Sequence, residues 1–428
     1  MTLISERPEL LAAIDRINTS EQAAAITFNT HITALAIARS LGKAGVPVLG
    51  LDRETGGLGQ RSRHLTALAL CPDVQDGGRA FVDFLLEIGP HFQQRPVLFP
   101  TNDDWVFAVA RHKEELEPYY RVPFSGQAVI DTALNKTALY QVAERMGIAI
   151  PESWYMDTLS LEDLASGSHP EVAALAARVP YPVILKPDES RAFYEAFQAK
   201  VFVVQDEAAF VERVQAAAQR GLRLVAQRII HTPPGGFYSV CSYLDARSTP
   251  LGVFVGRKLE QFPPDFGTSC LADARFVPEI AERGVQVLQA LGFHGISEIE
   301  FVQDPVSGEQ LLLDVNTRSW KWIGLPIASG VDLPLLAYRD AIGEPFSAPR
   351  QLDGVRWTFL RDYVKLLRSR GNVMPEEMIS REEWLGLIRG EVPAAGTLVD
   401  GILDPGDPEP FYDVLQGELF GFLYTCAC

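Results

Sequence analysis

The N-terminal part of the chain alternates short apolar runs with amphipathic segments. Apolar residues dominate 24–28, 46–51 and 96–100. The segment between the first two runs carries apolar residues at helical spacing, namely Ala34, Ile37, Ala38 and Leu41. Apolar strands that alternate with helices are typical of a parallel sheet with helices on both faces. We therefore predict a doubly wound α/β domain over residues 1–130.

The ends of these strands carry polar residues, and sheets of this kind bind ligands beyond the carboxyl ends of their strands. The residues at those ends are Asn29, Thr30 and His31 after the first strand and Thr101, Asn102, Asp103 and Asp104 after the third. Asn102 and Asp103 are also candidate N-caps of a helix that continues through Glu115. No GxGxxG motif follows a strand here, so a dinucleotide site is disfavoured.

A second pattern begins near residue 131. A helix with one apolar stripe runs from Asn135 to Gly147, where the glycine ends it. The strands predicted after it are 182–186, 200–204 and 222–230. Residues 188–199 carry charged and aromatic side chains without an apolar period, so we expect a mobile, protease-sensitive loop there.

Extended segments dominate the next part of the chain. They lie at 237–244, 251–259, 296–302 and 310–316. From about residue 346 to the end, short amphipathic helices surround the turn Asp404-Pro-Gly-Asp-Pro408. We expect residues 346–428 to form a small, mostly helical extension.

The last two extended segments predict an antiparallel hairpin, because turn-forming residues 304–308 lie between them. With Ser307 at the centre, Glu300 pairs with Asp314 and Glu298 pairs with Asn316, and all four share one face. The other face is apolar and consists of Ile299, Phe301, Leu311, Leu313 and Val315.

Two carboxylates that face each other across a ladder repel unless positive charge lies between them. A divalent cation meets this need, and carboxylate and amide oxygens suit Mg²⁺. The alternative is a solvated hairpin face, with Arg318 and Lys321 compensating the charge. The hairpin alone does not decide between the two interpretations.

Two lysines upstream favour the metal interpretation. Lys136 begins a helix, and Lys186 ends an apolar strand that we expect to be buried on both faces. A single lysine is usually a solvated side chain, but two that come from different elements can approach one phosphate group.

Charge and cysteine content narrow the class of protein. Among 428 residues, acidic residues outnumber basic ones by 55 to 38, and the net charge is −17. A chain this acidic repels nucleic acid and anionic lipid surfaces, so neither is an expected partner. No segment is long and apolar enough to be a membrane span. The five cysteines lack metal-ligand spacing, and we expect reduced thiols in a cytoplasmic protein.

Taken in order along 26–343, these motifs resemble the ATP-grasp superfamily of carboxylate–amine and carboxylate–thiol ligases. Asn135-Lys136 and Tyr181-Pro-Val-Ile-Leu-Lys-Pro187 look like its two lysine motifs. Glu300 with Asp314-Val-Asn-Thr-Arg318 resembles its metal signature. Residues 256–267 and 39–45 look like the branch of predicted carboligases that includes D-aspartate ligases.

The resemblance implies an ATP-grasp fold with an N-terminal pre-ATP-grasp domain (1–130). The ATP-grasp domain would cover 131–345, divided into a first nucleotide lobe (131–232) and a metal and substrate lobe (233–345). It implies ATP and Mg²⁺, with two ions expected, as cofactors.

Carried over by position, the resemblance also implies roles for individual residues. Lys136 and Lys186 would hold phosphates, and Arg257 and Arg318 would contact the transferring phosphate or the substrate carboxylate. The adenine would lie against Gln227, Arg228, Ile229 and Ile230, and the metal ions against Glu300, Asp314 and Asn316.

The sequence departs from the family pattern at two places. The family usually closes a glycine-rich lid after the second lysine, but 188–199 contains no glycine, so Arg191 is the cation expected to reach the phosphates from this segment. No acid follows the adenine strand to hold the ribose, so Tyr238, Ser239 or His231 is expected to substitute.

The implied reaction joins a carboxylate to an amine through an acyl phosphate and releases ADP and phosphate. The alternatives are another ATP-grasp chemistry, such as a carboxylase or kinase, and a non-catalytic nucleotide-binding regulator. We expect small, amino-acid-like substrates and a possible homodimer. The candidate substrate residues are His31, Arg61, Arg63, Asp103, Asp104, Lys258, Trp320, Lys321 and Trp322, although the two tryptophans could equally be core aromatics.

Overall fold

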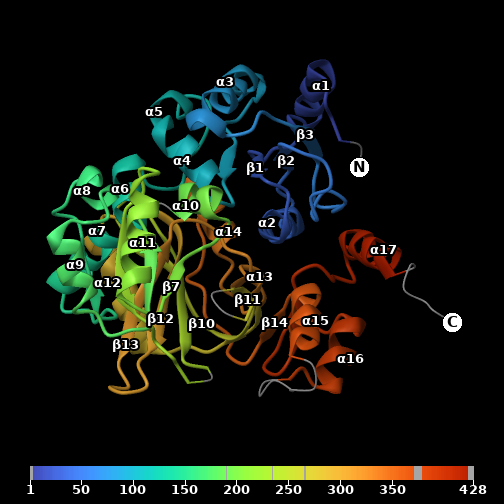
Figure 1. The fold of residues 1–428 in the computed structure, drawn as a ribbon. Coiled ribbons are helices and arrows are strands. Elements are labelled where there is room, and N and C mark those ends of the chain that lie inside the picture. The colour runs from blue at the N-terminus through green and yellow to red at the C-terminus, as the bar shows by residue number, and fades with distance from the viewer. Residues whose placement is uncertain (1–2, 189, 234, 265–266, 371–377, 423–428) are drawn as a thin grey trace.

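The computed structural model describes residues 3–188, 190–233, 235–264, 267–370 and 378–422 (Figure 1). Three sheets organise this part of the chain, and helices pack around each of them. Helices and strands alternate along the first domain, as the sequence predicts for an α/β protein.

The first sheet is parallel, with the strand order β3-β2-β1-β4. Its strands are β1 (Ala25–Phe28), β2 (Val48–Asp52), β3 (Ala67–Leu70) and β4 (Val97–Phe99). The surrounding helices are α1 (Arg7–Ile17), α2 (Ile32–Lys43), α3 (Arg79–Ile88), α4 (Asp103–Arg111) and α5 (Lys113–Leu116), with 3₁₀ turns at Gln75–Gly78 and Gly89–His91. The doubly wound sheet is thus confirmed, but the helix predicted through Glu115 breaks at His112.

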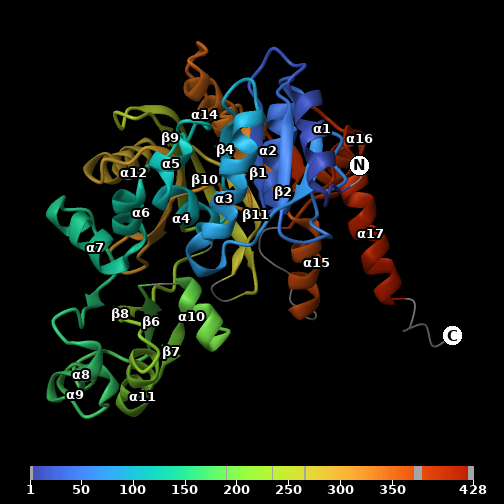
Figure 2. The same ribbon diagram turned by 90° about the horizontal axis from the view of Figure 1, so that it is seen from above.

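Two helices, α6 (Gln127–Leu134) and α7 (Lys136–Arg145), lead to the second sheet, whose order is β5-β8-β6-β7. Its strands are β5 (Ser153–Trp154), β6 (Val183–Pro187), β7 (Phe202–Val204) and β8 (Leu224–Arg228), and its helices include α8 (Leu161–Ala165), α9 (Pro170–Ala176) and α11 (Glu207–Ala218). This lobe buries an apolar cluster of its own. Figure 2 shows it projecting away from the first domain.

The loop predicted at 188–199 is wrong, because Ser190–Phe197 form a helix, α10. Phe193 is fully buried, and its ring centroid lies 4.9 Å from that of Phe197 and 4.8 Å from that of Phe202 on β7. Phe193 and Phe197 are one helical turn apart, so they share a face. The charged residues around these two phenylalanines obscured the helical spacing of the apolar positions in the sequence.

The third sheet has seven strands in the order β13-β12-β9-β10-β11-β14-β15. The predicted lobe 233–345 supplies β9 (Phe237–Leu244), β10 (Pro250–Phe262), β11 (Thr268–Ala274), β12 (Gly295–Gln303) and β13 (Gln310–Asn316). The helices of this lobe are α12 (Pro278–Ala290), α13 (Gly324–Ala328) and α14 (Leu333–Ile342).

The hairpin of β12 and β13 has the predicted register, since Glu300 pairs with Asp314 and Glu298 with Asn316. The apolar face differs in one position. A bulge after Glu300 pairs Phe301 with Leu312, so Leu312 is buried while Leu313 is only half-buried. An inserted residue shifts the alternation of side chains from that point onward.

The C-terminal extension is not only helical. Besides α15 (Leu360–Ser369), α16 (Arg381–Arg389) and α17 (Glu409–Phe422), it supplies β14 (Arg356–Thr358) and β15 (Leu398–Asp400). β14 pairs with β11, and β15 with β14, so the extension completes the large sheet. Runs of three residues are too short to predict from their pattern.

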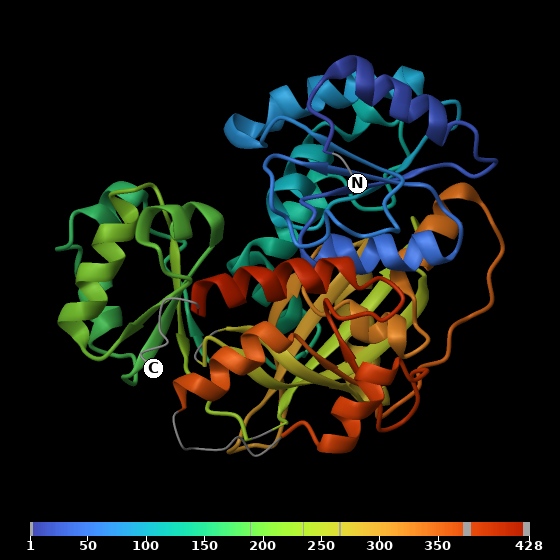
Figure 3. The same ribbon diagram turned by 90° about the vertical axis from the view of Figure 1, so that its right-hand side faces the viewer.

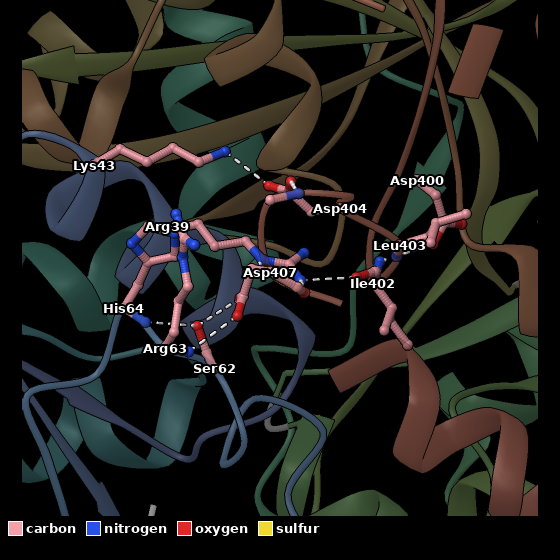
Figure 4. Close-up of polar contacts among 11 residues, drawn as sticks. Arg39, Lys43, Ser62, Arg63, His64, Asp400, Ile402, Leu403, Asp404 and Asp407 are labelled. Carbon is pink, nitrogen blue, oxygen red and sulfur yellow. Dashed lines mark hydrogen bonds and ion pairs between the residues drawn. The ribbon is translucent and has the colours of Figure 1, made fainter. Parts of the chain in front are cut away.

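The extension also returns to the first domain, and α17 lies beside that domain in Figure 3. Asp407 is 1% exposed and accepts hydrogen bonds from Arg39 Nε (2.9 Å), Ser62 Oγ (2.7 Å) and the Arg63 amide (2.9 Å) (Figure 4). Lys43 pairs with Asp404 at 2.7 Å. We call Arg39, Ser62 and Asp407 the clamp. It fastens α2 to a segment more than 300 residues away in sequence.

Candidate active site

The carboxylates of β12 and β13 lie on one face of the large sheet. Glu298 is 3% exposed and accepts hydrogen bonds from Asn316 Nδ2 at 3.0 Å and from Ser239 Oγ at 3.1 Å. Glu300 and Asp314 lie opposite each other in the ladder. Ser239 on β9 is thus committed to the carboxylate face and does not lie at the adenine strand.

Lysines from three elements neutralise this face. Lys136 is the first residue of α7, whose N-cap Asn135 accepts a hydrogen bond from the Ala138 amide, and its ammonium group pairs with Asp314. Lys258 on β10 pairs with Glu300 at 2.9 Å. Each of the two facing carboxylates therefore has a lysine ammonium group as its ion-pair partner.

The second predicted lysine, Lys186 on β6, comes from the opposite lobe. Burial lowers the pKa of its ammonium group, and the nearby carboxylates of Asp314 and Glu300 only partly oppose this effect. Lys136 and Lys186, the two predicted lysines, thus both lie near the carboxylate of Asp314.

Burial and neighbouring charges move the pKa values of the carboxylates in opposite directions. Burial, together with the charge of Glu300, raises the pKa of Glu298 to about 8. Burial also acts to raise the pKa of Asp314, but Lys136 outweighs it and holds the value below the ordinary one. The surroundings of Asp314 thus favour its ionised form, whereas those of Glu298 favour its protonated form.

The two candidate arginines are each held by a carboxylate. Arg257 on β10 donates to Asp273 at 2.9 and 2.5 Å. Arg318, which follows β13, donates to both oxygens of Asp103 at 2.7 and 3.2 Å. Asp103 lies in the first turn of α4, so this pair connects the first domain to the segment that follows β13.

The candidate adenine strand, β8, is anchored on both sides. The buried amide of Gln227 donates to Ser153 Oγ at 3.0 Å, and Arg228 pairs with Asp304 at 2.8 Å. Ile229 and Ile230 follow the strand and are half-buried.

The candidate substrate residues separate into two groups. His31, the N-cap of α2, lies near Lys321, while Asp104 lies in the first turn of α4 beside Asp103. Arg61 and Arg63 instead contact the C-terminal extension.

Trp320 and Trp322 are each 3% exposed and pack edge to face in the core, with ring centroids 5.8 Å apart. For these residues the core interpretation holds. The described residues include Arg191 on α10, but its side chain lies outside the described part.

Comparison with solved structures gives the fold. N5-carboxyaminoimidazole synthetase from Staphylococcus aureus has a TM-score of 0.57 at 14% identity, covering 84% of this chain and 88% of that one. L-amino acid ligase from Bacillus licheniformis has a TM-score of 0.55 at 15% identity, covering 78% and 76%. Both neighbours are ATP-grasp proteins. The chain has the ATP-grasp fold.

Other similarities agree with this ATP-grasp assignment. The biotin carboxylase domain of Hydrogenobacter thermophilus 2-oxoglutarate carboxylase, solved with Mg·ADP, has a TM-score of 0.57 at 17% identity and covers 78% of this chain and 73% of that one. By sequence, D-aspartate ligase of Enterococcus faecium (strain Aus0004) is 20% identical over 261 residues, or 58% of this chain. The match spans 60% of that relative's length. No protein-family model matches the chain.

The ATP-grasp site fits Mg²⁺ only together with a nucleotide. Across the described ranges, no three His, Cys, Asp or Glu side chains are grouped so as to hold a metal ion by themselves. Glu300 and Asp314 offer two carboxylates, and Asn316 donates through its amide nitrogen to Glu298, which leaves its oxygen as a ligand. Mg²⁺ usually takes one or two carboxylates and completes its shell with water and phosphate oxygens.

Several functional contacts of the ATP-grasp domain were not predicted. Asp273, Ser153 and Asp304 hold predicted residues, and Asp362 on α15 pairs with Lys321. These partners are distant in sequence or lie in segments without a motif. Only the cross-strand position of Asp273, opposite Arg257 on β11, could have been found from a strand register.

Proposed function

We propose that the protein is an ATP-dependent ligase that joins a carboxylate to an amine through an acyl phosphate, releasing ADP and phosphate. The observation that carries the proposal is the pairing of Asp314 and Glu300 with Lys136 and Lys258, while Lys186 approaches both from the other lobe. These lysines and carboxylates can release one another when a metal-bound polyphosphate enters, because the lysines can then pair with the phosphates and the carboxylates with the metal. The names of the D-aspartate ligase and L-amino acid ligase relatives support a carboxylate–amine ligase.

In this proposal Glu300, Asp314 and Asn316 would hold Mg²⁺, with two ions expected, and the ions would supply positive charge for the phosphates. Lys136 and Lys186 bind phosphate oxygens as point charges. Residues 227–230 present backbone groups to the adenine. Ser239 supports Glu298 and is not proposed as a ribose ligand.

Arg257 and Arg318 would stabilise the transferring phosphoryl group or the substrate carboxylate. Each is fixed by a bidentate or double contact to an acid, so little side-chain entropy is lost when the anion binds. The protein's contribution is positioning and electrostatic stabilisation, and no nucleophilic side chain is required.

The decisive test is analysis of the spent nucleotide. The wild-type protein is incubated with Mg·ATP and pairs of amino acids of both enantiomers, including D-aspartate, and nucleotides are separated by chromatography. The proposal predicts that ADP and phosphate are released only when both amino acids of a productive pair are present. Isotopic oxygen placed in the substrate carboxylate should appear in the released phosphate. AMP and pyrophosphate would contradict it.

A carboxylase is the second candidate, because one structural neighbour is a biotin carboxylase domain. Bicarbonate, without any amine, would then stimulate ADP release. A non-catalytic regulator would bind ATP tightly and turn nothing over with any acceptor.

We also propose a cytoplasmic protein that acts on small molecules, and a homodimer, which light scattering would test. Cys71, Cys241 and Cys270 are free thiols, all buried. Within the described ranges no helix has the length and apolar character needed to cross a membrane.

A further inference from the structure

Glu298 lies at the centre of a hydrogen-bond chain beside the candidate metal residues. It stands two residues before Glu300 on β12 and opposite Asn316 on β13, so these three side chains share one face of the large sheet. Its Oε2 accepts from Asn316 Nδ2 at 3.0 Å, and its Oε1 accepts from Ser239 Oγ on β9 at 3.1 Å. One carboxyl group therefore holds side chains from both neighbouring strands.

The burial of Glu298 speaks against direct contact with a substrate. The residue is 3% exposed and Ser239 is 2% exposed. Both oxygens of Glu298 accept from neutral donors, whereas Glu300 and Asp314 pair with lysines. Burying a carboxyl group costs free energy that two hydrogen bonds to neutral groups offset only in part. An acid at this position is therefore explained by its effect on its neighbours.

The neighbour that needs a fixed orientation is Asn316. Only the amide oxygen of an asparagine can bind a cation, because the amide nitrogen carries two donor hydrogens. A half-turn of the terminal torsion exchanges the oxygen and the nitrogen, and this torsion is broad and roughly two-fold. Glu298 removes the ambiguity, since its Oε2 takes Nδ2 and leaves Oδ1 for another partner.

This orientation is compatible with either charge state of Glu298. An ionised carboxylate accepts at both oxygens. The protonated acid can donate from Oε1 to Ser239 Oγ while Oε2 still accepts from Asn316, because a hydroxyl group both donates and accepts. Ser239 thus fixes the rotation of the Glu298 carboxyl group in both states.

We propose that Glu298 is a positioning residue for Asn316, which it turns so that Oδ1 and not Nδ2 is offered to the metal ion. The inference rests on the proposed function, in which Glu300, Asp314 and Asn316 bind Mg²⁺ together with the nucleotide. Glu298 itself touches neither metal nor substrate. Groups that orient metal ligands in this way usually change metal affinity by about 10- to 100-fold.

Metal binding, rather than turnover, is the direct measurement. Each protein is titrated with Mn²⁺ in excess ADP, because Mn²⁺ takes the same oxygen ligands as Mg²⁺. Water protons relax faster when Mn²⁺ is bound to a slowly tumbling protein, so the titration gives the Kd of the metal. Glu298→Ala should raise this Kd about tenfold or more. Glu298→Gln, whose amide oxygen still accepts from Asn316, should raise it less than about twofold.

A second substitution separates orientation from a general effect on the fold. Asn316→Asp places two equivalent oxygens at the position, so no partner is needed to turn the side chain. In this background Glu298→Ala should strengthen Mn²⁺ binding, because it removes a carboxyl group that faces the introduced one. The effect of Glu298→Ala thus reverses its sign between the two backgrounds, which a merely structural role would not produce.

Ser239→Ala and Ser242→Ala form a matched pair of controls. Each removes a buried hydroxyl group that bonds from β9 to β12, but Ser242 bonds to Ser297 at 3.0 Å on the opposite face of the sheet. Ser239→Ala should raise the Kd of Mn²⁺ about threefold or more, because it frees the rotation of Glu298. Ser242→Ala should leave the Kd unchanged.

Melting curves of all variants control for folding. If Glu298→Ala does not fold, Glu298→Met takes its place in both backgrounds, because methionine fills a similar space and offers only a weak acceptor.

The positioning role would be overturned by Glu298→Ala protein that binds Mn²⁺ like the wild type. It would also be overturned by a loss of equal size in the Asn316→Asp background. Wild-type protein that binds no Mn²⁺ in excess ADP would contradict the metal assignment and the positioning role together. Failure of the ligase reaction would appear separately, as wild-type protein that binds Mn²⁺ with ADP but releases no ADP from Mg·ATP with any pair of amino acids. The comparison of the two backgrounds would still decide the role of Glu298.

Discussion

At the residue scale, the two facing carboxylates of the candidate metal site, Glu300 and Asp314, each have a lysine partner in the free protein. The sequence predicts the facing pair Glu300 and Asp314 from strand alternation alone, and the register confirms it. The pattern could not reveal that Lys136 and Lys258 lie against them, because these contacts join residues 178 and 42 positions apart. If the two facing anions had no partners, removing one of them would stabilise the protein. Because each anion is paired with a buried lysine, removing it destabilises the protein instead.

Asp314→Asn should therefore lower the melting temperature of the metal-free protein, because it leaves the buried Lys136 without its counter-charge. Mg·ATP turnover should fall by about a hundredfold or more. Glu309→Gln, an exposed acid in the same hairpin, is the control for the charge change. A variant with raised melting temperature and unchanged Mg²⁺ dependence would restore the solvated-face interpretation.

Asp103→Asn should lower kcat while the KM for ATP changes less than about twofold, because the amide holds the Arg318 guanidinium less firmly. Asp103→Glu should recover part of the rate. Steady-state kinetics in both substrates measure the effect, and Glu114→Gln on the same domain is the control. Equal losses of kcat in Asp103→Asn and in the Glu114→Gln control would instead show a general effect of charge.

At the element scale, long apolar runs and hairpins were predictable and short or irregular elements were not. Three strands of the first sheet, β1, β2 and β4, and the β12–β13 hairpin follow from periodicity, whereas β3 was not predicted. The helix α10 was missed because two phenylalanines, Phe193 and Phe197, carry its buried face. The adenine strand β8 could be placed, whereas its anchors Ser153 and Asp304 could not.

Phe193→Ala should destabilise the small nucleotide lobe by about 3–5 kcal/mol, the usual cost of removing a buried phenylalanine ring. Because this lobe has its own core, α10 should become open to trypsin before the rest of the chain. Tyr194 is 49% exposed, so trypsin should cleave α10 in the Tyr194→Ala variant at the wild-type rate. Equal cleavage of the two variants would contradict the packing of α10.

At the scale of the whole molecule, the first domain and the large sheet are joined by shared cores and by the clamp. The clusters that fill the first domain continue into the large sheet, whereas the small lobe is separate. Arg39 donates to Asp407 and to the Ile402 carbonyl, and all of these groups are buried. The Asp103–Arg318 pair is a second connection between the first domain and the large sheet.

Asp407→Asn should lower the unfolding free energy by about 3–5 kcal/mol at neutral pH, because Arg39 is left buried without its counter-charge. Burial acts to raise the pKa of Asp407, but hydrogen bonds from the Arg63 amide, Ser62 and Arg39 lower it overall. The stabilisation is therefore present above the unfolded value and is lost as pH falls through the folded value.

Thermal melting across pH measures this dependence. The difference between wild type and Asp407→Asn should be constant near neutrality and shrink below about pH 4. Lys43→Gln, which breaks only the more exposed pair with Asp404, should cost less than about 1 kcal/mol. A difference that persists unchanged into acid would exclude the charged form of Asp407 as its source.

The clamp also sets an order of events while the chain is made. Arg39 leaves the ribosome 368 residues before Asp407, and β15 emerges only shortly ahead of it. Until then α2 carries an arginine without its counter-charge, and the seven-stranded sheet lacks its last strand. The first domain can begin to condense early, but the clamp and the large sheet are completed only after nearly the whole chain has been translated. A nascent chain stalled before residue 398 should therefore remain open to chaperones and proteases even though every proposed ATP-binding residue has already been synthesised.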